Sequence, residues 1–112
     1  MTELATKKCT PCQGGVPPLD AARKAELLEE LNAWKLVDDH HLSKSYSFSN
    51  YAKALNWVNK ISEIAESENH HPDVYLSWGL VRIDIWTHKI DNITESDFIL
   101  AAKLDHLESN SS

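Results

Sequence analysis

The stretch "NHHPDVYLSWGLVRIDIWTHK" (Asn69–Lys89) contains a helix end, two strands and the turn between them. The ring of a proline excludes helical backbone angles from the residue before it, so Pro72 predicts that the preceding helix ends at residue 69 or 70. Beyond it, Val74–Trp78 and Leu80–Thr87 have strand composition, and the second run alternates apolar and charged residues. The two runs meet at Gly79. The stretch therefore predicts an antiparallel hairpin directly after a helix.

A second hairpin is expected upstream. Trp34–Val37 is a short strand candidate, and Asp38-Asp39 is a turn signal. The segment after the turn carries apolar side chains that share one face of a strand: Leu42, Tyr46 and Phe48.

Three helices complete the pattern. The first can be capped by Asp20 and is expected to end near residue 32. The second can be capped by Ser49 or Asn50, and its apolar residues recur at helical spacing. These residues are Tyr51, Ala54, Leu55, Val58, Ile61 and Ala65. Before the third helix, Thr94-Glu95-Ser96-Asp97 matches a capping box, and the helix is expected to run to about residue 107.

The element order α-ββ-α-ββ-α predicts an α+β fold, a four-stranded antiparallel sheet with three helices packed on one face. A chain of 112 residues has the size of one domain. We expect this domain over residues 19–108, a flexible N-terminal arm over residues 1–18 and a frayed tail over residues 109–112.

The composition excludes several classes of partner. The chain has 42% apolar and 25% charged residues, as soluble globular proteins do, and a formal net charge of -6. Without clustered Lys and Arg, binding to nucleic acid or to an anionic membrane is not expected. No apolar run approaches the roughly 20 residues of a membrane-spanning helix, and the first residues lack the apolar core of a signal peptide. We therefore expect a cytoplasmic protein.

The two cysteines, Cys9 and Cys12, form a single C-x-x-C motif. A structural zinc ion normally takes four protein ligands, and the sequence has no second motif of this kind. We expect two reduced thiols in the N-terminal arm, without a catalytic role.

Five of the six histidines fall into two groups. For His40, His41 and His106 we expect solvated side chains. His70 and His71 differ because they lie on the extended exit from a helix, where adjacent side chains point to opposite sides. They can reach one cavity from two directions but seldom hold one metal ion together.

A third histidine is expected near this pair. In a hairpin that turns at Gly79, the end of the second strand lies beside the start of the first, so His88 approaches the histidine pair. Glu66 lies four residues before His70, where a helical metal site would need a histidine, and is expected to orient an imidazole. Imidazoles titrate near neutral pH and suit general acid–base catalysis. A metal site and incidental surface histidines remain open alternatives.

The segment "ENHHPDVYLSWGLVRIDIWTHK" closely resembles the signature of the pterin-4a-carbinolamine dehydratases, with paired histidines before a proline and Thr-His after the following hairpin. The resemblance also covers the Trp34 region, "YSFSNYAKALNWVNKISEIAE" and "TESDFILAAKLD", and spans about residues 19–107. The cysteine-bearing arm is similar to that of bacterial members linked to phenylalanine hydroxylase.

The resemblance implies a dehydratase that eliminates water from 4a-hydroxytetrahydropterin to give quinonoid dihydropterin, and so recycles tetrahydropterin for aromatic amino acid hydroxylation. It implies no metal and no organic cofactor. It also implies that His70, His71, His88 and Glu66 are the catalytic residues. Of these, His70 and His88 would transfer protons, His71 would bind and orient the substrate, and Glu66 would hold an imidazole.

The resemblance further implies a substrate-binding set: Asn69, His70, His71, Trp86, Thr87, His88, Trp34 and Asp97. In this set Trp34 would wall the pocket and Asp97 would add polar support, while Asn69 stands where some relatives carry an acidic residue. The expected partners are the pterin substrate, further copies of the chain in a homodimer or homotetramer, and a functional link to phenylalanine hydroxylase.

Two functions from other classes remain as alternatives. Some family members act as dimerisation cofactors of a transcription factor, so the chain could be a regulatory partner with vestigial catalysis. It could also be a small metal-binding protein that uses the three histidines or the Cys9/Cys12 pair.

Overall fold

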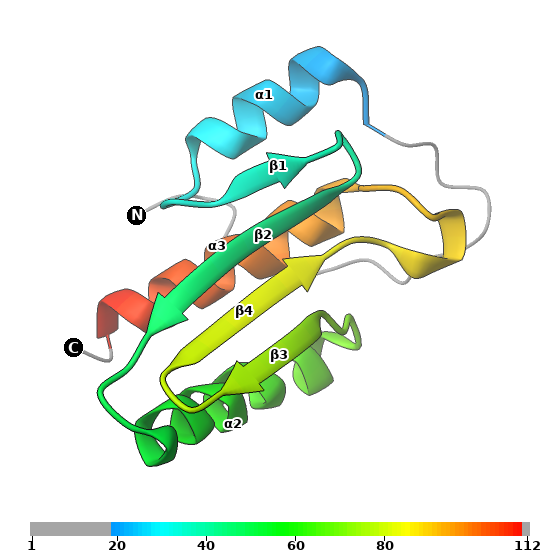
Figure 1. Cartoon of the computed structure of the whole chain (residues 1–112). Coiled ribbons are helices and arrows are strands. Elements are labelled where there is room, and N and C mark those ends of the chain that lie inside the picture. The colour runs from blue at the N-terminus through cyan, green and yellow to red at the C-terminus, as the bar shows by residue number, and fades with distance from the viewer. Residues whose placement is uncertain (1–18, 111–112) are drawn as a thin grey trace.

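The computed structural model describes residues 19–110. Its helices and strands follow the predicted order (Figure 1). The elements are α1 (Ala21–Glu29), β1 (Lys35–Val37), β2 (His41–Ser47), α2 (Tyr51–Glu68), β3 (Asp73–Ser77), β4 (Leu80–Ile85), the short 3-10 helix η2 (His88–Ile90) and α3 (Glu95–Asn110). The expectations for the N-terminal arm and for residues 111–112 lie outside the described residues.

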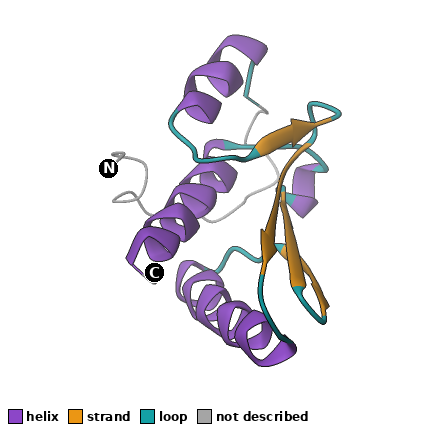
Figure 2. Cartoon of the chain, turned by 60° about the vertical axis from the view of Figure 1, so that its left-hand side comes forward, coloured by secondary structure: helices purple, strands orange, loops and turns teal. Residues whose placement is uncertain are grey.

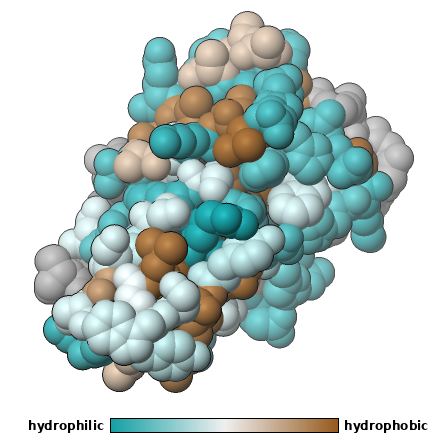
Figure 3. Space-filling view, in the orientation of Figure 1, coloured by the Kyte–Doolittle hydropathy of each residue, from teal (hydrophilic) through white to brown (hydrophobic). Residues whose placement is uncertain are grey.

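The strands form one sheet in the order β1-β2-β4-β3, and each neighbouring pair is antiparallel. The helices lie on one side of this sheet (Figure 2), so the predicted α+β fold is confirmed. The opposite face is open, and Figure 3 shows it as mainly polar, with apolar side chains gathered in separate patches.

Three element ends differ from the prediction by two residues or more. α1 ends at Glu29, before the expected residue 32, and the chain then turns through a left-handed residue, Ala33, with φ 63°. β4 ends at Ile85 because Thr87 pairs instead with Asn92, whose carbonyl accepts the Thr87 N–H at 2.9 Å. α3 continues past residue 107 to residue 110. Within the described residues, no helix has the length and apolar character needed to span a bilayer.

The turn between β3 and β4 depends on a close approach of the chain before α2. The Phe48 N–H donates to the Gly79 carbonyl at 2.9 Å, and a Cβ on Gly79 would lie 2.9 Å from the Phe48 carbonyl oxygen. A side chain at this position would force the two segments apart. Space, rather than an unusual φ, therefore requires the glycine.

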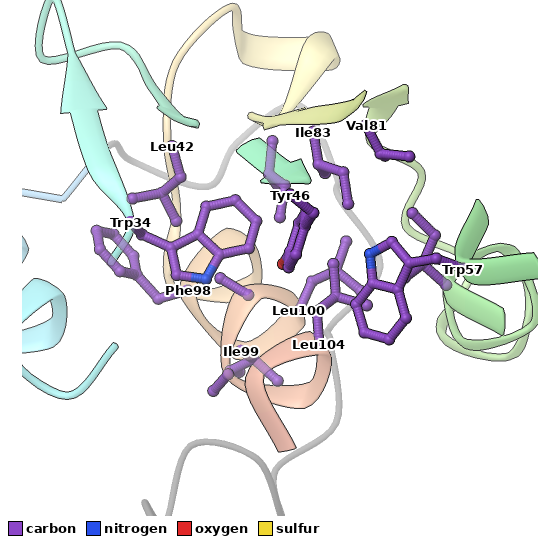
Figure 4. Close-up of a cluster of buried hydrophobic side chains, with 14 of the residues drawn as sticks. Trp34, Leu42, Tyr46, Trp57, Val81, Ile83, Phe98, Ile99, Leu100 and Leu104 are labelled. Carbon is purple, nitrogen blue, oxygen red and sulfur yellow. The ribbon is translucent and has the colours of Figure 1, made fainter. Parts of the chain in front are cut away.

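The core lies between the inner face of the sheet and the helices (Figure 4). The helix α2 contributes Trp57, which is 5% exposed, whereas Tyr51 and Leu55 are 46% and 40% exposed. The expected apolar stripe of α2 was therefore wrong at these last two positions. The buried face of the helix is centred on four residues: Ala54, Trp57, Ile61 and Ala65.

One charged side chain lies on the inner face of the sheet. Lys44 is 7% exposed, and its Nζ lies 3.0 Å from Asp105 Oδ1 and 2.8 Å from Glu108 Oε1. The same Nζ lies above the ring of Tyr46, 5.0 Å from the ring centroid. The buried ammonium group is thus paired with carboxylates from α3, as burial of a charge requires.

Candidate active site

The end of α2 sets the direction in which the paired histidines leave the helix. Asn69 adopts a left-handed conformation (φ 51°, ψ 40°), which asparagine tolerates better than most residues. Its N–H donates to the Glu66 carbonyl and the His70 N–H donates to the Ala65 carbonyl, both at 3.1 Å. These two bonds are those of a Schellman motif. They fix the backbone from which both imidazoles project.

His70 forms the buried half of the site. Its Nε2 lies 2.5 Å from Oδ1 of Asp97, and the two residues are 9% and 0% exposed. An ionised carboxylate only accepts hydrogen bonds, so with Asp97 ionised the proton of His70 is on Nε2. The other ring nitrogen, Nδ1, then keeps a lone pair that can accept a proton.

Asp97 is held by the start of α3. Its Oδ2 accepts the Thr94 N–H at 2.7 Å and the Thr87 hydroxyl at 2.8 Å. The first of these bonds is one half of the predicted capping box, in which the third helical residue bonds back to the residue before the helix. One carboxylate therefore caps α3 with one oxygen and orients His70 with the other.

His71 is paired on the other side of the chain. Its Nε2 lies 2.5 Å from Oε1 of Glu66, and both side chains are largely exposed, at 52% and 78%. His70 thus bonds to α3 and His71 bonds back to α2, as expected for adjacent side chains on an extended segment. Because water screens the second pair, it contributes little to stability.

His88 begins η2 directly after the hairpin. Its Nε2 lies 3.6 Å from Oδ1 of Asp73, the first residue of β3. Its ring meets the indole of Trp86 edge to face, with centroids 4.3 Å apart. The hairpin therefore brings the end of β4 beside the start of β3, as predicted.

The three histidines line one cavity of about 340 Å³, within the usual size range of small-molecule sites. The residues that line it are Asn69, His70, His71, Trp86, Thr87, His88 and Lys89. Glu66 and Asp97 are absent from this lining and reach it through the imidazoles to which they bond. Lys89 adds a cation that the sequence analysis did not single out.

Trp34 lies elsewhere. It is 6% exposed in the hydrophobic core (Figure 4). Its Nε1–H donates to Asp105 Oδ1 at 2.8 Å. The cavity lining does not include Trp34.

His40 and His41 are not simply solvated, contrary to the sequence-based expectation. Their ring centroids lie 5.4 Å and 5.6 Å from that of Trp86, and His40 Nε2 lies 2.9 Å from Asp91 Oδ1. The sequence did show that both histidines follow the turn at Asp38-Asp39 and lie at the start of a strand. The sequence analysis did not predict that this strand, β2, pairs with β4, which brings His41 beside Trp86.

Among residues 19–110 no group of three or more His, Cys, Asp or Glu side chains is arranged to hold a metal ion. Cys9 and Cys12 lie outside the described residues.

Comparison with known proteins identifies the family. The model of the pterin 4 alpha carbinolamine dehydratase family matches residues 17–107. The chain belongs to this family. A dehydratase-family relative from Rubrobacter xylanophilus, which carries the family's name, is 51% identical over 96% of this chain and 100% of its own length. Another, from Rickettsia canadensis, is 54% identical over 94% of this chain and 97% of its own length.

A solved dehydratase-family structure has a similar fold. It is described as a transcriptional coactivator/pterin dehydratase from Brucella melitensis, and it matches with a TM-score of 0.75 at 25% identity. The match covers 81% of this chain and 98% of that chain.

Proposed function

We propose that the protein is a 4a-hydroxytetrahydropterin dehydratase. The observation that carries the proposal is one cavity lined by three imidazoles, two of which are each 2.5 Å from a carboxylate. Family membership supplies the substrate class, a pterin carbinolamine.

The reaction requires only proton transfer. The C4a–O bond breaks, the N5–H proton leaves, and a C4a=N5 double bond forms as water departs. A base must accept the N5 proton and an acid must protonate the leaving hydroxyl group, and positioned imidazoles serve both purposes near neutral pH. The charge shift is internal to the pterin ring, so the side chains need only hold and move protons.

His70 is suited to the role of base. Asp97 fixes its tautomer and stabilises the imidazolium ion that forms when Nδ1 accepts a proton, as a buried carboxylate does in other acid–base pairs. We assign the acid to His88, which lines the same cavity just beyond the end of β4. We assign binding and orientation of the substrate to His71, held by Glu66.

The remaining cavity residues suit a flat polar ring system. The indole of Trp86 offers an apolar wall, and Asn69 lines the cavity beside the paired histidines. Asp97 acts through His70 and not on the ring. We do not assign Trp34 to substrate binding, because it lies in the core.

We further propose that the reaction recycles tetrahydropterin for phenylalanine hydroxylase in the cytoplasm, and that the chain works as a homo-oligomer. The open sheet face and the adjoining turn carry large exposed apolar side chains, which suit contact with a second copy. These are Tyr75, Trp78 and Leu80.

The test is turnover of freshly generated carbinolamine by wild type and His88→Ala. Loss of a general acid is expected to lower kcat by about 10²-fold or more. His106→Ala, on α3 and outside the cavity lining, is the matched control and should keep wild-type turnover. If His88→Ala stays within about threefold of wild type, His88 has no part in the chemistry. A wild type that binds another protein without any turnover would favour the regulatory alternative.

A further inference from the structure

A second group of side chains contacts Trp86, which lines the cavity. Three imidazoles surround Trp86: His88 on the cavity side at 4.3 Å between centroids, and His40 and His41 at 5.4 Å and 5.6 Å. The Nδ1 atoms of His40 and His41 lie 3.2 Å apart, so one of them donates a hydrogen bond to the other. Trp86 therefore contacts imidazoles from η2 and from β2 with its preceding turn.

The turn that carries His40 is itself fixed. Asp38 and Asp39 both adopt left-handed angles, with φ 52° and 55°. The Nζ of Lys24, a residue only 4% exposed on α1, donates to the Asp39 carbonyl at 3.1 Å and to its carboxylate at 3.0 Å. This contact ties the turn to the helical layer, so His40 projects from a held backbone.

The segment that carries His88 is fixed at its far end by the same turn. Asp91 ends η2 in a left-handed conformation (φ 49°), and its N–H donates to the His88 carbonyl at 3.1 Å. Its carboxylate lies 2.9 Å from His40 Nε2. In Figure 1 the turn between β1 and β2 lies at the same end of the sheet as η2. The His40–Asp91 pair therefore joins the β1–β2 turn to the turn that carries His88.

We infer that His40 and Asp91 are positioning residues for His88 and Trp86. This inference rests on the proposed function for its kinetic part. Neither residue lines the cavity. It acts by holding the far end of the His88 turn and one side of the Trp86 ring. A displaced acid loses rate steeply, because proton transfer requires a heavy-atom distance near 3 Å.

The pair adds little to stability, which makes the inference testable. Asp91 is 88% exposed and His40 is 31% exposed, and ion pairs in water are worth little. Variants should therefore fold. We expect His40→Ala to lower kcat about 10-fold with KM nearly unchanged. Asp91→Gly, which suits the left-handed angle but removes the carboxylate, should have the same effect.

Three comparisons separate positioning from a general structural role. Asp91→Asn keeps both the left-handed preference and an acceptor oxygen, and should restore most of the activity. The double variant His40→Ala/Asp91→Gly should be no worse than His40→Ala, because that single change already removes the contact with Asp91. Lys35→Ala, an exposed change in the same hairpin, should be silent.

A readout without turnover keeps this inference distinct from the proposed function. The imidazole ¹⁵N and ¹H resonances of His88, assigned by their absence in His88→Ala, should move in His40→Ala and Asp91→Gly and stay in place in Lys35→Ala. An inactive wild type would refute the proposed function. The His88 resonances would still show whether the His40–Asp91 contact positions His88. Unmoved His88 resonances, or kcat within about twofold of wild type in both variants, would overturn the positioning role.

Discussion

Replacing Asp97 by asparagine tests how the buried pair works. In the wild type the Thr94 N–H donates to Oδ2 of Asp97 at 2.7 Å, and Oδ1 of an asparagine can accept the same bond. Its amide group then faces His70 Nε2 and donates to it, so the proton of His70 must move to Nδ1. The nitrogen proposed as the base no longer has a lone pair. We expect kcat to fall by about 10²-fold or more, the range for loss of a general base.

The same change should cost less stability than Asp97→Ala. Asparagine retains the cap of α3 but loses a charge-assisted bond at a helix N-terminus, which is worth about 1 to 2 kcal/mol. Asp97→Ala would also leave the buried Thr94 N–H without its acceptor and should cost about 2 kcal/mol or more. Urea unfolding of the two variants measures both costs.

A matched control comes from α1. Asp20 also caps a helix, with Oδ1 accepting the Arg23 N–H at 2.8 Å, but it lies outside the cavity lining. Asp20→Asn should change stability slightly and leave kcat unaltered. If Asp97→Asn, folded as judged by urea unfolding, keeps at least one third of the wild-type kcat, the carboxylate does not set the tautomer that the reaction needs.

Three further predictions follow from individual side chains. His70→Ala should mainly lower kcat, whereas His71→Ala should mainly raise KM, and steady-state kinetics with equal kcat losses and unchanged KM would contradict that division. Burial, aided by two nearby carboxylates, raises the pKa of Tyr46. The folded state therefore keeps the neutral phenol while the unfolded chain ionises near pH 10, so the free energy of unfolding should fall above about pH 10, and less so in Tyr46→Phe. A Cys9→Ser/Cys12→Ser variant should retain wild-type turnover, and complete loss in a folded variant would reveal a role for the thiols.

Local sequence rules predicted the features that local chemistry decides. A proline excludes helix before it, so Pro72 fixed the end of α2 to within a residue. The alternation after Gly79 predicted β4, and hairpin geometry then predicted that His88 approaches the histidine pair. The capping box predicted the start of α3, although not that Asp97 would also bind His70.

Contacts between distant segments could not be predicted in this way. Lys44 occupies an inward position on β2 because carboxylates from α3 compensate its charge, and nothing near it in the sequence indicates them. Trp34 was expected at the pocket, but Asp105 of α3 holds it in the core. His40 was expected in solvent, and its contacts with Trp86 and Asp91 depend on how β2 pairs with β4.

The most direct test of the central claim is the rate at which purified wild-type protein converts freshly generated 4a-hydroxytetrahydropterin to quinonoid dihydropterin in the presence of a chelator. Absorbance follows the product, and the uncatalysed rate is measured in parallel. A site of three imidazoles that moves only protons predicts acceleration over the uncatalysed rate that the chelator does not reduce. A rate equal to the uncatalysed one, or one abolished by the chelator and restored by metal, would contradict it.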